Sequence, residues 1–158
     1  GEDQFLHKQT STGQNTLLTE HHFKDIRWIY FSKTDSALFV VDHLKIKKVT
    51  TLGKVLVIAD NLKEAGAPFE GVADRHYIFG IWTDKNKDLY LALYGASKVK
   101  KISANGIITT VFESQKGWSP CGGMMTTSGV LWIMEFSDKN TTRVRKIDPN
   151  GKHTVYGA

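Results

Sequence analysis

The sequence predicts an all-β chain built from repeated four-stranded antiparallel units, and three observations lead to this expectation. A pentad of the form basic-apolar-basic-basic-apolar occurs three times in the 158 residues. A short apolar run precedes each pentad, and a turn glycine follows it within a few residues. No segment longer than about two helical turns keeps an apolar stripe at the helical period. The pentads occupy 45–49, 98–102 and 143–147.

Length and composition indicate one globular unit. A chain of 158 residues is about one domain long, and 41% hydrophobic with 23% charged residues is an ordinary globular balance. No stretch approaches the ~18 apolar residues of a membrane span, so no membrane span is expected. The single cysteine, Cys121, excludes an internal disulfide and a cysteine-rich zinc site. On an inner strand, Cys121 is expected to be a small buried residue.

The spacing of the turn glycines gives the repeat length. Gly13, Gly53, Gly106 and Gly151 stand 40, 53 and 45 residues apart. An incomplete copy opens the chain, because 6–13 aligns with 144–151. A period of about 40 to 50 residues is typical of β-propeller blades or of two-helix solenoids. Short runs rich in β-branched and aromatic residues, separated by turn residues, favour the propeller.

Each full repeat divides into four strands. The N-terminal partial blade, 4–18, supplies only the third and fourth strands, near 4–9 and 14–18. The first full blade, at about 26–59, has strands near 26–32, 37–42, 44–50 and 54–59. The second, at about 78–112, has strands near 78–84, 88–93, 98–103 and 107–112. The third, at about 121–156, has strands near 121–126, 130–135, 143–148 and 152–156. Asn105-Gly106 and Asn150-Gly151 predict type I′ hairpin turns, in which both central residues have positive φ. A short helix is expected only around 61–65.

The last repeat carries a family resemblance. The residues that carry it are Ser119-Pro120-Cys121-Gly122-Gly123, then Ser128-Gly129 with Leu131-Trp132-Ile133-Met134-Glu135, and then 143–151, which ends in Asp148-Pro149-Asn150-Gly151. This series resembles one blade of the NHL-repeat and streptogramin-lyase-like propellers, which include gluconolactonase-like proteins. The middle blade matches moderately, and the first matches in its strand pattern and turn glycine. The resemblance covers nearly all of 4–157. It implies the propeller fold, whereas blades of this kind serve lyases, lactonases and interaction scaffolds alike.

Three and a half blades form an incomplete ring. Propellers of this kind close with six or seven blades, or with at least four. An open arc exposes an apolar blade face at each end, and about 25 cal/mol per Å² of apolar surface favours covering it. We therefore expect the chain to be part of a larger propeller or to self-associate through its open blade faces.

Candidate ligand-binding residues lie on one rim. The loops that join blade to blade, and those that join the second strand to the third, emerge on the same face of a propeller. The rim candidates are His22, Asp42, Arg75, His76, Tyr94, Trp118 and Glu135. Histidines beside carboxylates could hold a divalent metal, but the chain has no His-x-x-x-His spacing, so no cofactor is expected. No catalytic or metal-binding residue is assigned.

The resemblance bears on function through the rim acids. It implies a histidine, a glutamate and a divalent ion in the lyases, and acidic and amide ligands for the ion in the lactonases. Glu135 and Asp42 occupy the repeat's recurring acidic position, whereas Leu93 stands there in the middle blade. The acid is mostly a structural feature of the blade, and no histidine in the final blade's central loops could pair with Glu135.

We therefore expect a non-catalytic β-propeller module that binds a protein or small-molecule ligand at the channel rim. The alternative is a metal-dependent lyase or lactonase. The net charge of +5 includes nine basic residues in the pentads, which lie on third strands away from the rim, so nucleic-acid binding is not expected. An exported protein, periplasmic or extracellular, is an expectation that rests on the resemblance and on a chain that begins in mid-blade.

Overall fold

The chain forms antiparallel β-sheets. A computed structural model describes residues 4–69 and 71–157, and within these the strands form three four-stranded sheets and one two-stranded sheet. The all-β prediction of four-stranded antiparallel blades is therefore confirmed. The chain divides into two compact units, 1–62 and 63–158, and each is described by itself.

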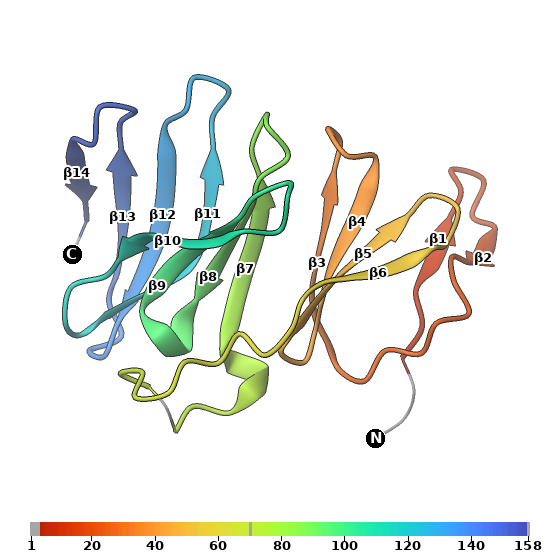
Figure 1. The fold of residues 1–158 in the computed structure, drawn as a ribbon, viewed down its shortest axis with the longest axis horizontal. Helices are drawn as coiled ribbons and strands as arrows, with labels where there is room; N and C mark the ends of the chain where they lie inside the picture. The colour runs from red at the N-terminus through yellow and green to blue at the C-terminus, as the bar shows by residue number, and fades with distance from the viewer. Residues whose placement is uncertain (1–3, 70, 158) are drawn as a thin grey trace. The chain divides into compact units, whose positions relative to one another are not determined.

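The first unit combines a hairpin with one complete blade (Figure 1). The hairpin pairs β1 (His7–Gln9) with β2 (Asn15–Leu17). The blade contains β3 (Ile26–Ser32), β4 (Ala37–Asp42), β5 (Lys45–Thr50) and β6 (Val55–Ala59), in sequence order across the sheet. Leu6, Phe23, Val40 and Val49 form the buried core, with Leu18 and Leu38 packed against it. The hairpin is thus fixed to the blade by apolar side chains.

The second unit contains two complete blades (Figure 1). The first has β7 (Ile78–Thr83), β8 (Leu89–Leu93), β9 (Lys98–Ile102) and β10 (Ile108–Glu113). The second has β11 (Trp118–Met125), β12 (Leu131–Ser137), β13 (Thr142–Ile147) and β14 (His153–Tyr156). Every residue of β8 is buried, and Ile133 of β12 is fully buried too. A Cβ added at Gly123 would lie 2.8 Å from the Trp82 ring, so the two sheets need glycine at this close approach.

The hairpin turns differ from the expected type I′ geometry. In the turn after β9, the Gly106 amide donates to the Ser103 carbonyl and the Ser103 amide to the Ile107 carbonyl. Gly106 has a φ of 84°, whereas Asn105 is not among the described residues with positive φ. This is a three-residue loop in which a type I turn is followed by one left-handed residue. The Asn150-Gly151 turn has the same geometry, and the type I′ prediction was wrong at both sites.

Helical structure also lies elsewhere than expected. No helix forms at 61–65, where Asn61 adopts a left-handed φ of 51° that a right-handed helix cannot contain. Two short 3₁₀ turns occur instead, η1 (Asp74–His76) and η2 (Tyr94–Ala96). Among residues 4–69 and 71–157, no helix has the length and apolar character that a membrane crossing requires.

Candidate functional site

An aromatic pocket lies in the second unit. Its cavity measures about 380 Å³, and three of its six lining side chains are the aromatic rings of Phe79, Tyr94 and Phe136. The complete lining is Val72, His76, Phe79, Tyr94, Cys121 and Phe136. These residues come from the connection before β7, from β7 itself, from η2, and from β11 and β12. The pocket therefore depends on both blades of the unit.

Two β-bulges supply side chains to this pocket. The pairing of β7 with β8 shifts between Ile78 and Gly80, which leaves Phe79 as the extra residue. The pairing of β11 with β12 shifts between Pro120 and Gly122, which leaves Cys121 as the extra residue. A bulge bends its strand and re-aims a side chain. The expectation of a buried Cys121 was wrong, because the bulge gives the thiol partial exposure at the pocket.

The aromatic rings hold one another in place. The Tyr94 ring stacks on Phe69 at 5.4 Å between centroids and meets Phe79 edge-on at 5.0 Å. The His76 ring stacks on Phe79 at 6.1 Å. Pairs of this geometry contribute roughly 0.5 to 1.5 kcal/mol each beyond the area that they bury. Because Phe79 and Tyr94 each have aromatic neighbours, this part of the pocket wall is preorganised.

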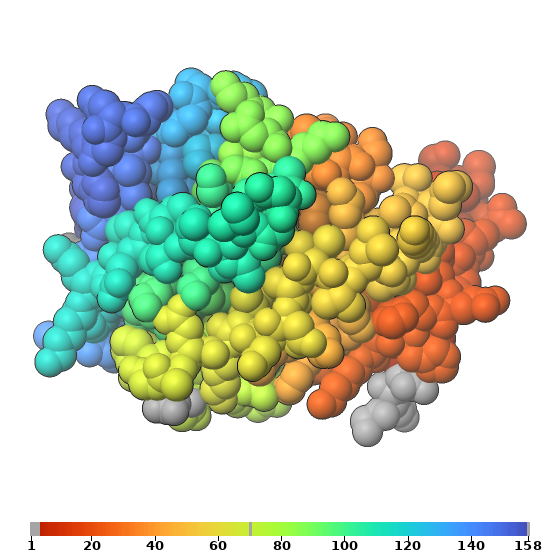
Figure 2. Space-filling model, viewed as in Figure 1, coloured from red at the N-terminus to blue at the C-terminus, as the bar shows by residue number. Residues whose placement is uncertain are grey.

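The connection between β6 and β7 is anchored near both of its ends, at Lys63 and Glu64 and at Asp74 and Tyr77. The Glu64 carboxylate lies 2.8 Å from the Lys98 ammonium and also contacts Lys100, and the Glu64 amide donates to the Tyr77 hydroxyl at 2.8 Å. The Lys63 ammonium lies 3.0 Å from the Asp74 carboxylate. In Figure 2 this segment, drawn in yellow-green, lies against the green strands of the same unit. The connection thus holds Val72 and His76 in the pocket wall.

Glu135 is a buried ion-pair residue in this structure. Its carboxylate has no exposed surface and accepts from Arg143 Nε at 2.8 Å, Arg143 Nη2 at 3.2 Å and Arg145 Nε at 3.0 Å. Burial raises the pKa of Glu135, but the hydrogen bonds from Arg143 and the nearby Arg145 charge outweigh it and hold the pKa below its ordinary value. A carboxylate already shared by two guanidinium groups does not fit a divalent cation site.

The first unit repeats this arrangement with other residues. The Asp42 carboxylate lies 2.5 Å from the Lys47 ammonium, and the Lys47 ammonium lies 2.8 Å from His21 Nε2. Lys47 also lies over the Phe23 ring at 5.0 Å. Burial and the Lys47 charge lower the pKa of His21 below its ordinary value. Asp42 is thus neutralised by a cation from the pentad, as Glu135 is.

The structure brings two of the predicted rim residues together. His76 and Tyr94 line the aromatic pocket, and Arg75 precedes His76 in η1. Trp118 lies under the Arg143 guanidinium at 3.9 Å and lines a second, polar hollow of about 380 Å³ with Lys116, Asp138 and Lys139. In the first unit, the exposed His22 ring meets Phe5 edge-on at 4.6 Å. Among the residues that the structure describes, no three His, Cys, Asp or Glu side chains group as metal ligands.

Sequence reasoning missed three residues of the pocket. Val72, Phe79 and Cys121 were not among the predicted rim residues, whereas Phe136 directly follows the rim candidate Glu135. Phe79 and Cys121 lie in strands, and the two bulges turn their side chains toward the pocket. A register shift of one residue leaves no signal in a hydrophobic pattern.

Comparison with known proteins shows the fold. No protein-family model and no curated protein matches the chain. Virginiamycin B lyase from Staphylococcus aureus matches with a TM-score of 0.65 at 15% identity, over 96% of this chain and 48% of that one. A gluconolactonase from Xanthomonas campestris matches with a TM-score of 0.61 at 13% identity, over 85% of this chain and 48% of that one. A protein of unknown function from Bacteroides caccae matches with a TM-score of 0.60 at 17% identity, over 94% and 52%.

These matches confirm the resemblance to the streptogramin-lyase and gluconolactonase propellers at the level of the fold. The chain spans about half the length of these solved structures. At such low identity, a shared fold carries no assignment of activity.

Proposed function

We propose that the chain is a non-catalytic β-propeller binding module, and that the aromatic pocket of the second unit is its ligand site. The observation that carries the proposal is the pocket itself, a hollow of about 380 Å³ whose wall includes the packed rings of His76, Phe79 and Tyr94. Pockets lined by aromatic and apolar side chains with few polar groups are typical of small-molecule binding sites.

The lining indicates the chemical class of the ligand. Phe79, Tyr94 and Phe136 offer ring faces and edges, while none of the six lining residues carries a carboxylate. A cationic ligand would therefore find no counter-charge within the lining. A flat apolar group, such as an aromatic ring of a small molecule or of a protein side chain, satisfies the stacking geometry. His76 and the Tyr94 hydroxyl supply the polar contacts that could orient it.

The charge arrangement around Glu135 supports binding over catalysis. An enzyme of the lyase or lactonase kind would need a rim carboxylate free to hold an ion, whereas Glu135 is engaged by Arg143 and Arg145. Asp42 is engaged by Lys47 in the same way. The printed names of the matching structures include a lyase and a gluconolactonase, so the enzyme alternative is an explicit outcome of the test.

The test is a ligand-observed NMR screen of aromatic fragments such as indole and naphthalene. We expect saturable binding that Tyr94→Ala weakens at least about fivefold, since a ring contact of this kind contributes about 1 kcal/mol. Trp28→Ala is the control, because Trp28 is exposed on β3 of the first unit and does not line the pocket. Equal binding by both variants would refute the site. Stoichiometric divalent metal in purified protein, with hydrolytic or lyase activity lost on chelation, would support the enzyme alternative.

We also propose self-association, which the open face of the last blade supports. Met124, Met134, Val144 and Tyr156 expose between 37% and 54% of their surface, and Tyr156 pairs with Val144 across β13 and β14. Contiguous apolar patches of this kind mark interaction surfaces. Two copies would supply about as much chain as one of the matching lyases. Light scattering over a range of concentrations should show a dimer that Met134→Lys weakens; a monomer at every concentration would contradict it.

A further inference from the structure

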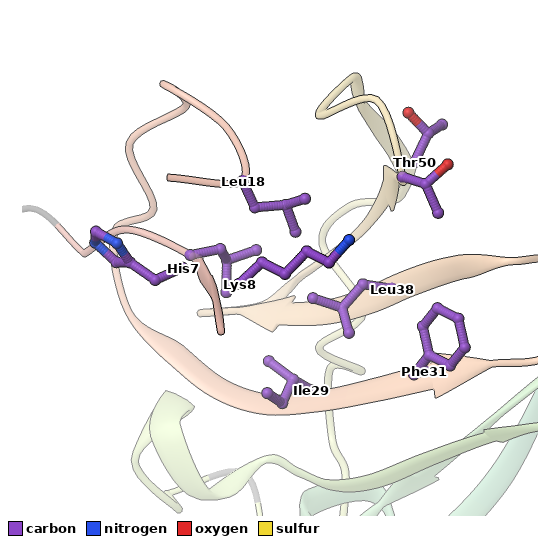
Figure 3. Close-up of a pocket in the computed structure, with 9 residues that line it drawn as sticks. His7, Lys8, Leu18, Ile29, Phe31, Leu38 and Thr50 are labelled. Atoms are coloured by element: carbon purple, nitrogen blue, oxygen red, sulfur yellow. The ribbon is translucent and has the colours of Figure 1, made fainter. Parts of the chain in front are cut away.

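The first unit holds an apolar groove, which is a different site from the aromatic pocket of the second unit. It has a volume of about 370 Å³ and lies between the β1–β2 hairpin and strands β3 to β5 (Figure 3). Ile29 and Phe31 of β3 line it and are each 53% exposed, and Leu38 lies beside them. Figure 3 shows the Lys8 side chain extending over Leu38 toward Thr50. The remaining lining residues are Leu6, His7, Leu18 and Thr51.

Strand β1 has an unpaired edge beside this groove. Within the described part of the chain, β1 pairs only with β2. The Leu18 amide donates to the Leu6 carbonyl, and the Thr10 amide donates to the Gln14 carbonyl. Because hydrogen-bonded pairs alternate along an antiparallel ladder, the backbone groups of His7 and Gln9 point to the opposite edge. An edge of this kind is a template for another strand.

Comparison with the complete blades shows what the hairpin lacks. Counted back from the turn glycine, β1 corresponds to the third strand of a blade, and His7 takes the place of Lys47, Lys100 and Arg145. In the complete blades these three cations each meet a carboxylate. In two of them the carboxylate belongs to the adjacent second strand, where Asp42 is the last residue and Glu135 lies two residues before the end. His7 is exposed, and no such strand lies beside it among the described residues.

We propose that the groove and the free edge of β1 form an acceptor site for an extended peptide strand of a partner protein, with alternating apolar residues and a carboxylate near His7. Alternate side chains of the strand would cover Ile29, Phe31 and Leu38. The backbone of this strand would pair with His7 and Gln9. Its carboxylate would lie on the face of the strand that points away from the groove, diagonal to His7. Strand addition of this kind derives affinity from main-chain hydrogen bonds and specificity from pockets for alternate side chains.

The sequence itself supplies a probe with this chemistry. A synthetic peptide of residues 26–42 contains the first and second strands of a blade and ends in Asp42. In the complete blade, Val40 stands opposite Lys47, and Asp42 stands two residues further along. Because His7 corresponds to Lys47, Val40 of a peptide paired with β1 would lie opposite His7. Binding is measured by isothermal calorimetry on the full chain, together with amide hydrogen exchange at His7 and Gln9.

We expect saturable binding of one peptide per chain, with slowed exchange at His7 and Gln9. Phe31→Asp should weaken binding at least about tenfold, since it places a charge in the apolar contact. The matched control is Ile107→Asp, because Ile107 is exposed to a similar extent, at 58%, in a turn of the second unit. A peptide carrying Asp42→Asn should bind up to about fivefold more weakly, the range of a cross-strand charge pair. Thermal melting confirms that both protein variants fold.

Three results would overturn the proposal. One is the absence of peptide binding by a wild-type protein that is monomeric. Another is binding that Phe31→Asp leaves unchanged, or that leaves exchange at His7 and Gln9 as fast as before. The third is a dimer that the peptide cannot displace and that Phe31→Asp dissociates, which would identify a second copy as the occupant.

Discussion

The Glu64 carboxylate lies 2.8 Å from the Lys98 ammonium, although the two residues are 34 positions apart. Leu93 stands in the middle blade where Asp42 and Glu135 stand in the others, so that blade has no acid at this position to meet Lys98 and Lys100 of its pentad. The long connection before β7 brings Glu64 to the missing position, where it meets Lys98 and Lys100 together. One role of the connection before β7 is therefore electrostatic. The contact of Glu64 with Lys98 and Lys100 also fixes a wall of the aromatic pocket.

Removing the Glu64 charge should destabilise the second unit. Burial raises the pKa of Glu64, but hydrogen bonds from Lys100 and Lys98 outweigh it and keep the pKa below its ordinary value of 4.5. A depressed carboxylate pKa contributes stability above the unfolded-state pKa, and that stability is lost as the pH falls through the folded-state pKa. Glu64→Gln should cost about 1 to 2 kcal/mol of unfolding free energy at pH 7.

Urea denaturation at a series of pH values from 7 downward measures this difference. The wild type and Glu64→Gln should converge in stability as the pH falls through the lowered pKa of Glu64, because protonation removes the same charge that the substitution removes. A difference that stays the same at every pH would show that Glu64 acts through packing and not through its charge.

Glu135→Gln should be the more damaging substitution. It leaves Arg143 and Arg145 buried without a counter-charge, and breaking a buried ion pair in this way costs about 3 to 5 kcal/mol. Glu113→Gln makes the same chemical change at an exposed position of β10 and should stay within about 0.5 kcal/mol of the wild type. Chemical denaturation at neutral pH compares the three proteins. Equal stability of Glu135→Gln and wild type would mean that Glu135 is held for a purpose other than structure.

The contact between His21 and Lys47 should appear in the titration of His21. Burial and the Lys47 charge lower the pKa of His21 below 6.5, so its folded-state contribution to stability is present above pH 6.5 and declines as the pH falls through the lowered value. Lys47→Met removes the neighbouring cation and should raise the pKa of His21. NMR titration of the imidazole signals measures both values. A His21 pKa that is unchanged by Lys47→Met would show that the 2.8 Å contact does not persist in solution.

The repeat made most of the fold predictable. The pentads and turn glycines located third strands and hairpins, because alternation and turn chemistry are local properties of a sequence. The first strand of the last blade begins at Trp118 instead of near 121, since the sheet continues through Pro120 past the bulge at Cys121. The turns were found correctly, but their geometry was not. Asn-Gly suits more than one loop type, and the hydrogen bonds that distinguish them involve residues on both sides of the glycine.

The site was predictable only in part. His76 and Tyr94 follow from the rule that propeller loops share a rim, and both line the pocket. Phe79 and Cys121 could not be found in this way, because a bulge depends on how two strands pair. The ion pair of Glu64 with Lys98 joins residues from different segments of the chain. The only sign of it in the sequence was that position 93 holds a leucine in place of an acid.

The reactivity of Cys121 tests the aromatic pocket most directly. Burial, together with the negative charge of Glu135, raises the pKa of the Cys121 thiol, so the thiolate fraction is small for any reagent. The ratio of modification rates by N-phenylmaleimide and N-ethylmaleimide cancels that fraction, because both reagents react with the same thiolate. Cys121 is the only cysteine, so each rate reports on this site.

If the pocket binds flat apolar groups, N-phenylmaleimide should react with saturation kinetics. Relative to free cysteine, its rate advantage should be at least about tenfold, the equivalent of burying part of one phenyl ring. Tyr94→Ala should return the ratio toward that of free cysteine, while Trp28→Ala leaves it unchanged. A wild-type ratio equal to that of free cysteine would contradict the proposed ligand site.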